Sequence, residues 1–139
     1  MPAVYDWQHV VSERDLDDLG HANNISYLKW MQSASLAHSS AQGWPIEAYR
    51  TLGQGWVVRS HFIEYLTSAR LGDEIVVRTW VANLKKVTSL RRYQMIRVAD
   101  QVTLAKAYSD WAFVDFTSGV PKRIPAEVSQ AFEIVPDDQ

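Results

Sequence analysis

The chain has 139 residues, of which 47% are hydrophobic and 22% are charged, a balance that fits one globular domain and excludes a disordered chain. A formal net charge of −2 gives no basic surface of the kind that binds nucleic acid, so we expect no nucleic-acid partner. The lack of cysteine excludes disulfides, thiolate metal sites and cysteine nucleophiles.

The first part of the chain predicts one strand and one long helix. Residues 4–13 alternate as a strand does, and the connector at residues 15–22 contains Gly20, which suits an unusual backbone angle. From Asn24 onward, apolar residues recur at spacings of three and four, which predicts a helix of roughly 18 residues that ends before Gly43.

Four strands are predicted after a short connector. They cover residues 55–67, 73–86, 89–99 and 102–117, with Asp100-Gln101 as a hairpin turn and a short helix in the proline-bounded tail at 121–133. Short connections imply an antiparallel sheet, and the single long helix must cover one of its faces, which makes the fold α+β. Small residues on the helix would let a curved sheet approach it closely. We expect residues 1–139 to form a single domain.

Two features bear on location and assembly. The first ten residues lack the basic and then apolar layout of a signal peptide, and no apolar run could cross a bilayer, so we expect a cytoplasmic protein with no membrane partner. Six Trp, six Tyr and four Phe are many for this length, and large aromatics dominate cores and interfaces. This content suggests that some surface is buried against another subunit.

Polar groups are concentrated directly before the long helix. In chain order they are Asp15, Asp17, Gly20, His21, Asn23 and Asn24, followed by Tyr27. This spacing resembles the start of the hotdog-fold acyl-CoA thioesterases, and it is most similar to the 4-hydroxybenzoyl-CoA thioesterase family with its long-chain acyl-CoA members. Weaker matches follow at residues 64–66, 69, 72–74, 113–115 and 121–125. The resemblance spans essentially the whole chain and implies a hotdog fold, in which a five-stranded antiparallel sheet wraps around one long central helix.

The resemblance assigns the chemistry to Asp17, as the nucleophile that attacks the thioester or the general base that activates water. A carboxylate just before a helix N-terminus lies beside backbone N–H groups that can stabilise charge on the carbonyl oxygen. The structural alternative is that Asp17 only caps a turn. Asp15 is expected to fix the loop or meet solvent, and Asp18 has an equally weak claim to a role in the reaction.

His21 is the only histidine inside the motif. It is expected either to hydrogen-bond the substrate carbonyl or orient Asp17, or simply to satisfy backbone carbonyls of the connector. The other histidines, His9, His38 and His61, are interpreted as structural.

Asn23 and Asn24 occupy the cap region of the helix, where a side-chain oxygen accepts from a free backbone N–H. The resemblance places the N–H that binds the substrate oxyanion at about Asn24. Tyr27 lies one turn further on, and either lines the acyl pocket or packs in the core.

Coenzyme A carries a 3′-phosphate and a diphosphate, which surface Lys or Arg side chains must meet. Three basic pairs are available: Lys85-Lys86, Arg91-Arg92 and Lys122-Arg123. The first two flank a hairpin and are expected to form one small positive patch.

The sequence therefore predicts an acyl-CoA thioesterase that needs no metal and no cofactor, with acyl carrier protein as an alternative bearer of the thioester. The resemblance implies a homodimer or homotetramer with sites at the subunit boundary. Two other functions stay open: a hotdog hydratase acting on enoyl or 3-hydroxyacyl thioesters, and a non-catalytic acyl-CoA-binding protein.

Overall fold

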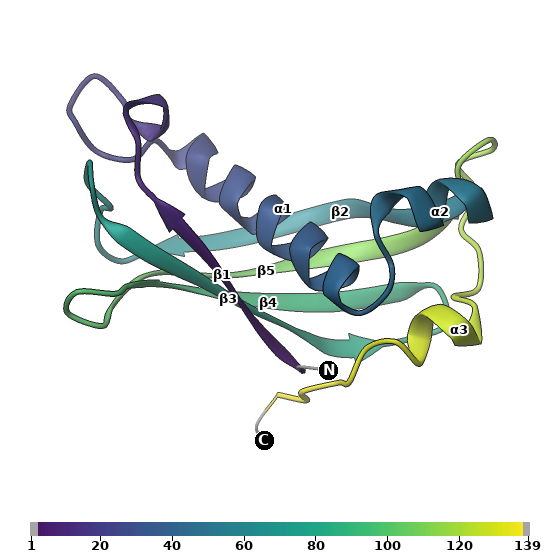
Figure 1. Cartoon of the computed structure of the whole chain (residues 1–139). Coiled ribbons are helices and arrows are strands. Elements are labelled where there is room, and N and C mark those ends of the chain that lie inside the picture. The colour runs from purple at the N-terminus through teal and green to yellow at the C-terminus, as the bar shows by residue number, and fades with distance from the viewer. Residues whose placement is uncertain (1–2, 138–139) are drawn as a thin grey trace.

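A computed structural model describes residues 3–137, which form one sheet and three α-helices (Figure 1). In chain order the elements are β1 (Val4–Val10), a 3-10 turn (Glu13–Asp15), α1 (Asn24–Ala41), α2 (Ile46–Leu52), β2 (Gln54–Tyr65), β3 (Glu74–Leu84), β4 (Thr88–Arg97), β5 (Val102–Asp115) and α3 (Ala126–Ser129). The domain boundaries predicted at residues 1 and 139 lie outside the described residues.

The five strands pair antiparallel in the order β1-β3-β4-β5-β2, so the predicted sheet is confirmed. β3, β4 and β5 follow one another through tight turns, and Gln101 takes the left-handed conformation (φ 58°) in the turn predicted at Asp100-Gln101. β1 and β2 lie at the two edges of the sheet. The short helix predicted in the tail is α3.

The inner face of the sheet follows from alternation along the strands. Ile75, Val77 and Thr79 on β3 are at most 1% exposed, while the residues between them are partly exposed. On β4, Tyr93 and Met95 continue the same buried face. This face carries the helix, as the sequence pattern requires.

The α1 helix lies across that face, and it begins at Asn24 as predicted (Figure 1). Asn23 caps it, since the Asn23 side-chain oxygen accepts from the Ile25 N–H (2.8 Å). Met31 and Ala34 are both fully buried on its inner side, and the small Ala34 side chain allows a close approach to the sheet. α1 packs mainly against β1 and β3.

The core has two clusters of apolar side chains, one near each end of α1. The first includes Tyr27, Trp30, Ile75, Val77 and Met95, and the second includes Tyr49, Val81, Phe113, Ile124, Val128 and Phe132. The second cluster is closed by α2 and α3, which lie at the opposite end of the molecule from the segment that joins β1 to α1 (Figure 1).

Two elements differ from the prediction. The first strand ends at Val10 rather than at residue 13, because the Asp15 carboxylate accepts from the Ser12 N–H (2.9 Å) and turns the chain. The segment predicted as a plain connector before β2 contains α2, which begins directly after Pro45 and ends at Gly53 in the left-handed conformation (φ 76°). Among residues 3–137, no helix has both the length and the apolar character needed to cross a membrane.

Candidate active site

The motif loop, defined as residues 15–24, is a tight hairpin that leads from β1 into α1. Leu16 pairs with Ala22, and the Asp17 N–H donates to the His21 carbonyl (2.7 Å). Gly20 makes the reversal possible because its φ of 79° is in the left-handed region, as the sequence predicted. The hairpin fixes the position of each polar side chain relative to the start of α1.

Asp17 uses one of its two carboxylate oxygens to hold the hairpin. Its Oδ1 accepts from the backbone N–H groups of Leu19 (2.9 Å) and His21 (3.2 Å). Its Oδ2 accepts no hydrogen bond from residues 3–137, and the side chain is exposed. Asp17 therefore caps a turn, as the structural alternative requires, and still presents one free carboxylate oxygen to solvent.

Asp15 faces the other way and fixes the loop. Its Oδ2 accepts from the Ser12 N–H (2.9 Å) and lies 2.8 Å from His9 Nε2. Burial alone would raise the pKa of Asp15, but the hydrogen bonds from Ser12 and His9 outweigh it, so the pKa lies below its ordinary value. The predicted loop-fixing role of Asp15 is confirmed, as is the structural role of His9.

The backbone of Asn24 is left free at the start of α1. The Asn23 side chain caps Ile25, and the Asn23 carbonyl accepts from the Ser26 N–H (2.9 Å). The Asn24 N–H, by contrast, donates to no acceptor within residues 3–137, and Asn24 is exposed. A free N–H at a helix N-terminus is a site for negative charge.

Two hydrogen bonds fasten the loop to α1, so that Asp17 and Asn24 belong to one hydrogen-bonded unit. The Asp15 carbonyl accepts from the Asn23 N–H (2.7 Å) and from the Ser26 hydroxyl (2.9 Å). Both bonds use the backbone of Asp15, which lies two residues before Asp17.

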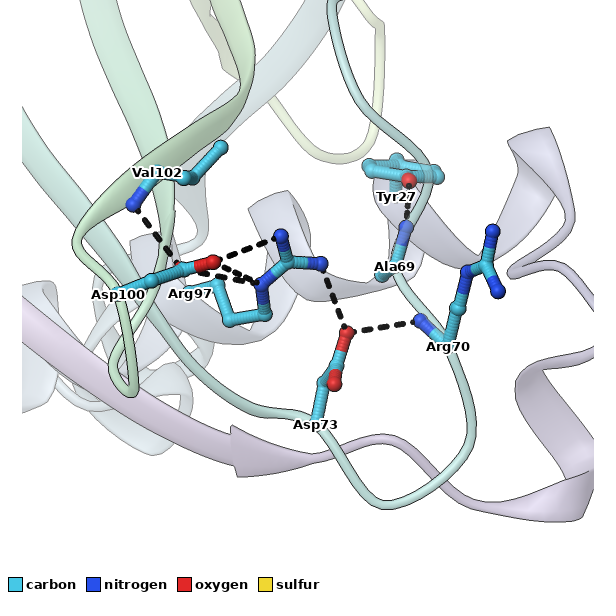
Figure 2. Close-up of polar contacts among 7 residues, drawn as sticks. All are labelled: Tyr27, Ala69, Arg70, Asp73, Arg97, Asp100 and Val102. Carbon is cyan, nitrogen blue, oxygen red and sulfur yellow. Dashed lines mark hydrogen bonds and ion pairs between the residues drawn. The ribbon is translucent and has the colours of Figure 1, made fainter.

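The connection between β2 and β3 supports the motif loop from the side. The Ala22 N–H donates to the Ala69 carbonyl (2.9 Å), and the Ala69 N–H donates to the Tyr27 hydroxyl (3.1 Å; Figure 2). Asp73 closes this connection by accepting from the Arg70 N–H (3.0 Å) and from Arg97 (3.4 Å; Figure 2). Ala69 and Asp73, which belong to the weaker matches named above, therefore take part in this support.

Tyr27 is a core residue. Its side chain is 2% exposed and packs against Trp30 and Tyr65, and burial raises the pKa of its hydroxyl. Of the two interpretations of Tyr27, the structure favours core packing over a place in the acyl pocket.

His21 contributes its backbone to the hairpin and leaves its ring unused. The ring is partly exposed and forms no hydrogen bond with residues 3–137, so it satisfies no backbone carbonyl there. It does not bond Asp17 either. A contact with substrate stays a prediction for His21.

The basic residues are arranged differently from the prediction. Arg91 is 7% exposed and points into the protein, whereas Arg92 lies on the opposite face of β4 and pairs with Asp137. The prediction that Lys85-Lys86 and Arg91-Arg92 form one surface patch is therefore wrong. Arg91 shares the parity of buried Tyr93 and Met95 along the strand, and this alternation was the signal available in the sequence.

A different basic cluster forms at the turn between β3 and β4. The Lys86 carbonyl accepts from the Ile124 N–H (2.8 Å), which brings the proline-bounded segment beside this turn. The four exposed residues gathered there are Lys85, Lys86, Lys122 and Arg123, called the basic cluster below. Among residues 3–137, no group of three His, Asp or Glu side chains is arranged to hold a metal ion.

A cavity of about 320 Å³ lies beside the second half of α1. Its walls are mainly apolar and include Leu36, Ile46, Trp56, Val81, Trp111 and Phe132. Ser35, Ser39, Tyr49 and Arg91 add polar groups. Such a mixture of apolar walls and a few convergent polar groups is typical of small-molecule sites. The sequence gives no local signal for this site, because most of its residues come from α1, α2 and every strand but β1.

The sequence model of the thioesterase-like superfamily matches residues 11–132, which is most of the chain. The chain belongs to this superfamily. The match includes the motif loop, the basic cluster and every residue named above on the cavity wall. The predicted family, the hotdog thioesterases, is confirmed, and so is the predicted class of enzyme, a thioester hydrolase.

Solved structures with the same fold include other thioesterases. A 1,4-dihydroxy-2-naphthoyl-CoA thioesterase from Synechocystis superposes with a TM-score of 0.85 at 15% identity, covering 92% of this chain and 94% of that chain. A DHNA-CoA thioesterase from Staphylococcus aureus gives a TM-score of 0.81 at 17% identity, with 86% and 80% covered. A hypothetical protein from the same organism, solved in complex with CoA, gives 0.86 at 12% identity, with 92% and 80% covered. At these identities the likeness concerns the fold, which is α+β with a five-stranded antiparallel sheet.

Proposed function

We propose that this superfamily member hydrolyses acyl-CoA thioesters to a carboxylic acid and free coenzyme A, at a reaction centre formed by Asp17 and the first turn of α1. One observation carries the proposal: a single fastened loop presents a free carboxylate oxygen on Asp17 and a free backbone N–H on Asn24. These are the two groups that thioester hydrolysis requires, one to attack or to activate water and one to stabilise the oxyanion.

In this reaction the thioester carbonyl oxygen binds the Asn24 N–H at the positive end of α1. The free oxygen of Asp17 either attacks the carbonyl carbon or removes a proton from the attacking water. On both routes the bond between carbon and sulfur breaks, and the sulfur leaves as the coenzyme A thiolate, which then takes up a proton. On the first route, water hydrolyses the resulting anhydride and restores the Asp17 carboxylate. The unused ring of His21 is available to donate to the substrate.

The basic cluster is the proposed contact for the phosphates of coenzyme A. Its four residues are exposed and lie on two segments that the backbone bond between Ile124 and Lys86 holds side by side, whereas Arg92 is neutralised by Asp137. The cluster belongs to the turn between β3 and β4, at the opposite end of the molecule from the motif loop (Figure 1). The two ends of the 18-residue α1 are themselves about 27 Å apart. A single subunit is thus poorly arranged to hold both ends of one acyl-CoA molecule.

A homodimer formed along β2 resolves this separation. β2 is an edge strand, so one row of its backbone groups is unpaired, and Val57, Val58 and Phe62 on it are 39–52% exposed. A second copy paired antiparallel to β2 would run in the opposite direction and bring its basic cluster toward the motif loop of the first copy. With α1 as the central helix of each hotdog, the sites then lie at the subunit boundary. A pair of such dimers is compatible with this arrangement, and a cytoplasmic location stays a prediction.

The test of the function is the release of free thiol from a panel of aliphatic and aromatic acyl-CoAs. Wild type is compared with Asp17→Ala and with Asp18→Ala, a neighbouring exposed carboxylate that serves as the matched control. We expect thiol release by wild type and Asp18→Ala, and loss of most of the rate in Asp17→Ala with the fold retained by circular dichroism. Equal rates in all three proteins would contradict the reaction centre, and no release from any member would contradict the function.

The test of the assembly is sedimentation equilibrium of the wild type. A dimer has twice the 15.9 kDa mass of the chain. A Val58→Lys variant places a charge on the exposed edge strand and is expected to shift the protein toward monomer and to reduce thiol release together. A fully active monomer would contradict the shared site.

A further inference from the structure

Arg91 is a buried cation beside the cavity. Its side chain projects from β4 toward α1, and Nη1 donates to His38 Nδ1 (2.9 Å) and to the Thr79 hydroxyl (3.1 Å). Because a guanidinium group can only donate, the acceptor in the first contact must be the imidazole nitrogen of His38. These two contacts fix the plane of the guanidinium at the cavity wall.

Most of the hydrogen-bonding capacity of Arg91 is left over. A guanidinium group has five N–H donors, and the two bonds above use only those on Nη1. Nε and Nη2 donate to no acceptor within residues 3–137, and none of the ion pairs among those residues includes Arg91. A buried charge of this kind is costly unless something pairs with it, and burial lowers the pKa of the group.

The hydroxyl groups of the cavity wall already have partners in the protein, whereas the buried Trp111 indole N–H has none among residues 3–137. Ser35 bonds Tyr93 (2.8 Å), and Ser39 bonds Tyr49 (2.9 Å), whose hydroxyl also accepts from the Trp56 indole (3.2 Å). Arg91 is therefore the wall residue whose charge is left for a ligand, and the surrounding wall is apolar. The cavity suits a mainly hydrocarbon group that ends in an anionic oxygen.

The cavity lies along α1 from the proposed reaction centre. Ile25, Lys29, Gln32 and Leu36 are spaced four, three and four residues apart, so they form one stripe on the helix, and all four are exposed. Gln32 and Leu36 line the cavity. Gln32 is eight residues beyond Asn24, a distance of about 12 Å along the helix. An acyl chain with its thioester at Asn24 can reach the cavity by following this stripe.

We propose that the cavity receives the far end of the acyl group, and that Arg91 selects acyl groups whose far end carries a carboxylate. This inference rests on the proposed function, since it names the class of substrate for that reaction. The carboxylate would accept from Nε and Nη2 in the paired geometry that guanidinium groups favour.

The test compares pairs of acyl-CoAs of equal chain length, in which one member ends in a methyl group and the other in a carboxylate. The shortest pair is hexanoyl-CoA and adipyl-CoA, and the longest is hexadecanoyl-CoA and hexadecanedioyl-CoA. The catalytic efficiency of wild type is expected to be about tenfold or more higher for the carboxylate member at the length that reaches Arg91. Arg91→Met should lose this preference and keep its rate on the unsubstituted member. The matched control is Arg92→Met, which removes a cation from the opposite face of the same strand and should keep the preference.

A second measurement covers the case in which Arg91→Met does not fold. Inhibition of the wild type by free acids compares each dicarboxylic acid with the monocarboxylic acid of equal length, and the dicarboxylic acid is expected to inhibit at lower concentration. The role of Arg91 is overturned, and the proposed function stands, if wild type hydrolyses both members of every acyl-CoA pair equally and is inhibited equally by the monocarboxylic and dicarboxylic acids. A preference for an uncharged hydroxyl end also overturns it. A wild type that hydrolyses no thioester overturns the proposed function itself.

Discussion

At the start of α1 the polar groups are exposed and bonded mostly to neighbouring backbone, whereas at its far half a charged group is buried and only partly bonded. Asp17 gives one oxygen to the hairpin and keeps the other free, and Asn24 keeps its N–H. Arg91 donates from Nη1 to His38 and Thr79, while its Nε and Nη2 have no acceptor within residues 3–137. At both ends, the part of the polar group that the fold leaves unbonded is the part to which we assign a role: attack and oxyanion binding in the proposed reaction at one end, and recognition of the substrate in the further proposal at the other.

The largest effect is expected from a substitution that removes the free carboxylate oxygen of Asp17 but keeps an oxygen to hold the hairpin. In Asp17→Asn the amide oxygen can still accept from the Leu19 and His21 N–H groups, so the hairpin should persist, but the free carboxylate oxygen is gone. We expect thiol release to fall by about 10²–10⁴-fold, measured as kcat at saturating substrate. Unchanged melting with unchanged kcat would leave Asp17 with the hairpin role alone.

Asp15 is expected to govern stability rather than catalysis. Asp15→Ala removes the acceptor for the Ser12 N–H and the partner of His9, and should cost about 1–3 kcal/mol of the free energy of unfolding. Urea denaturation measures this loss. A variant with full stability and no activity would reverse the roles assigned to Asp15 and Asp17.

The contribution of Asp15 should also depend on pH. Its folded pKa lies below the ordinary value of 3.8, so the ionised group stabilises the fold above that value. The contribution is lost as the pH falls from 3.8 through the lowered pKa. The stability difference between wild type and Asp15→Asn should therefore be larger at neutral pH than in acid. A difference that grows on acidification would contradict the sign of the shift.

The smallest effect is expected at the basic cluster. Replacing Lys122 and Arg123 by Glu should raise KM for an acyl-CoA by about tenfold at low salt and less at high salt, with kcat nearly unchanged, because exposed charges are screened. Lys106→Glu, an exposed cation on β5, is the control. Equal changes in KM for both proteins would mean that net charge, and not this cluster, attracts the substrate.

Sequence patterns predicted the elements that depend on local rules. The alternation along β3, a cap at Asn23 or Asn24 and the left-handed Gly20 are each determined by a few neighbouring residues, and all three appear in the structure, with Asn23 as the cap. The residues of the motif loop could also be named, because the family resemblance assigns them by position.

The parts that escaped prediction depend on contacts between distant segments. The cavity joins α1 and α2 to four strands, so no single stretch of sequence encodes it. The basic cluster depends on the bond between Ile124 and Lys86, which lie far apart in the chain. Arg91 was the exception, since strand parity with Tyr93 and Met95 already indicated that it points inward.

The most direct test of the reaction centre removes one backbone N–H. Asn24 is the first residue of α1 and follows Asn23 in an extended conformation (φ −77°, ψ 152°), so proline fits there without breaking the helix. Thiol release is compared between Asn24→Pro, which lacks the N–H, and Asn24→Ala, which keeps it. We predict that Asn24→Ala stays within a few-fold of wild type while Asn24→Pro loses about 10²–10³-fold in kcat with its helix content intact. Equal activity of the two variants would contradict an oxyanion site at the start of α1.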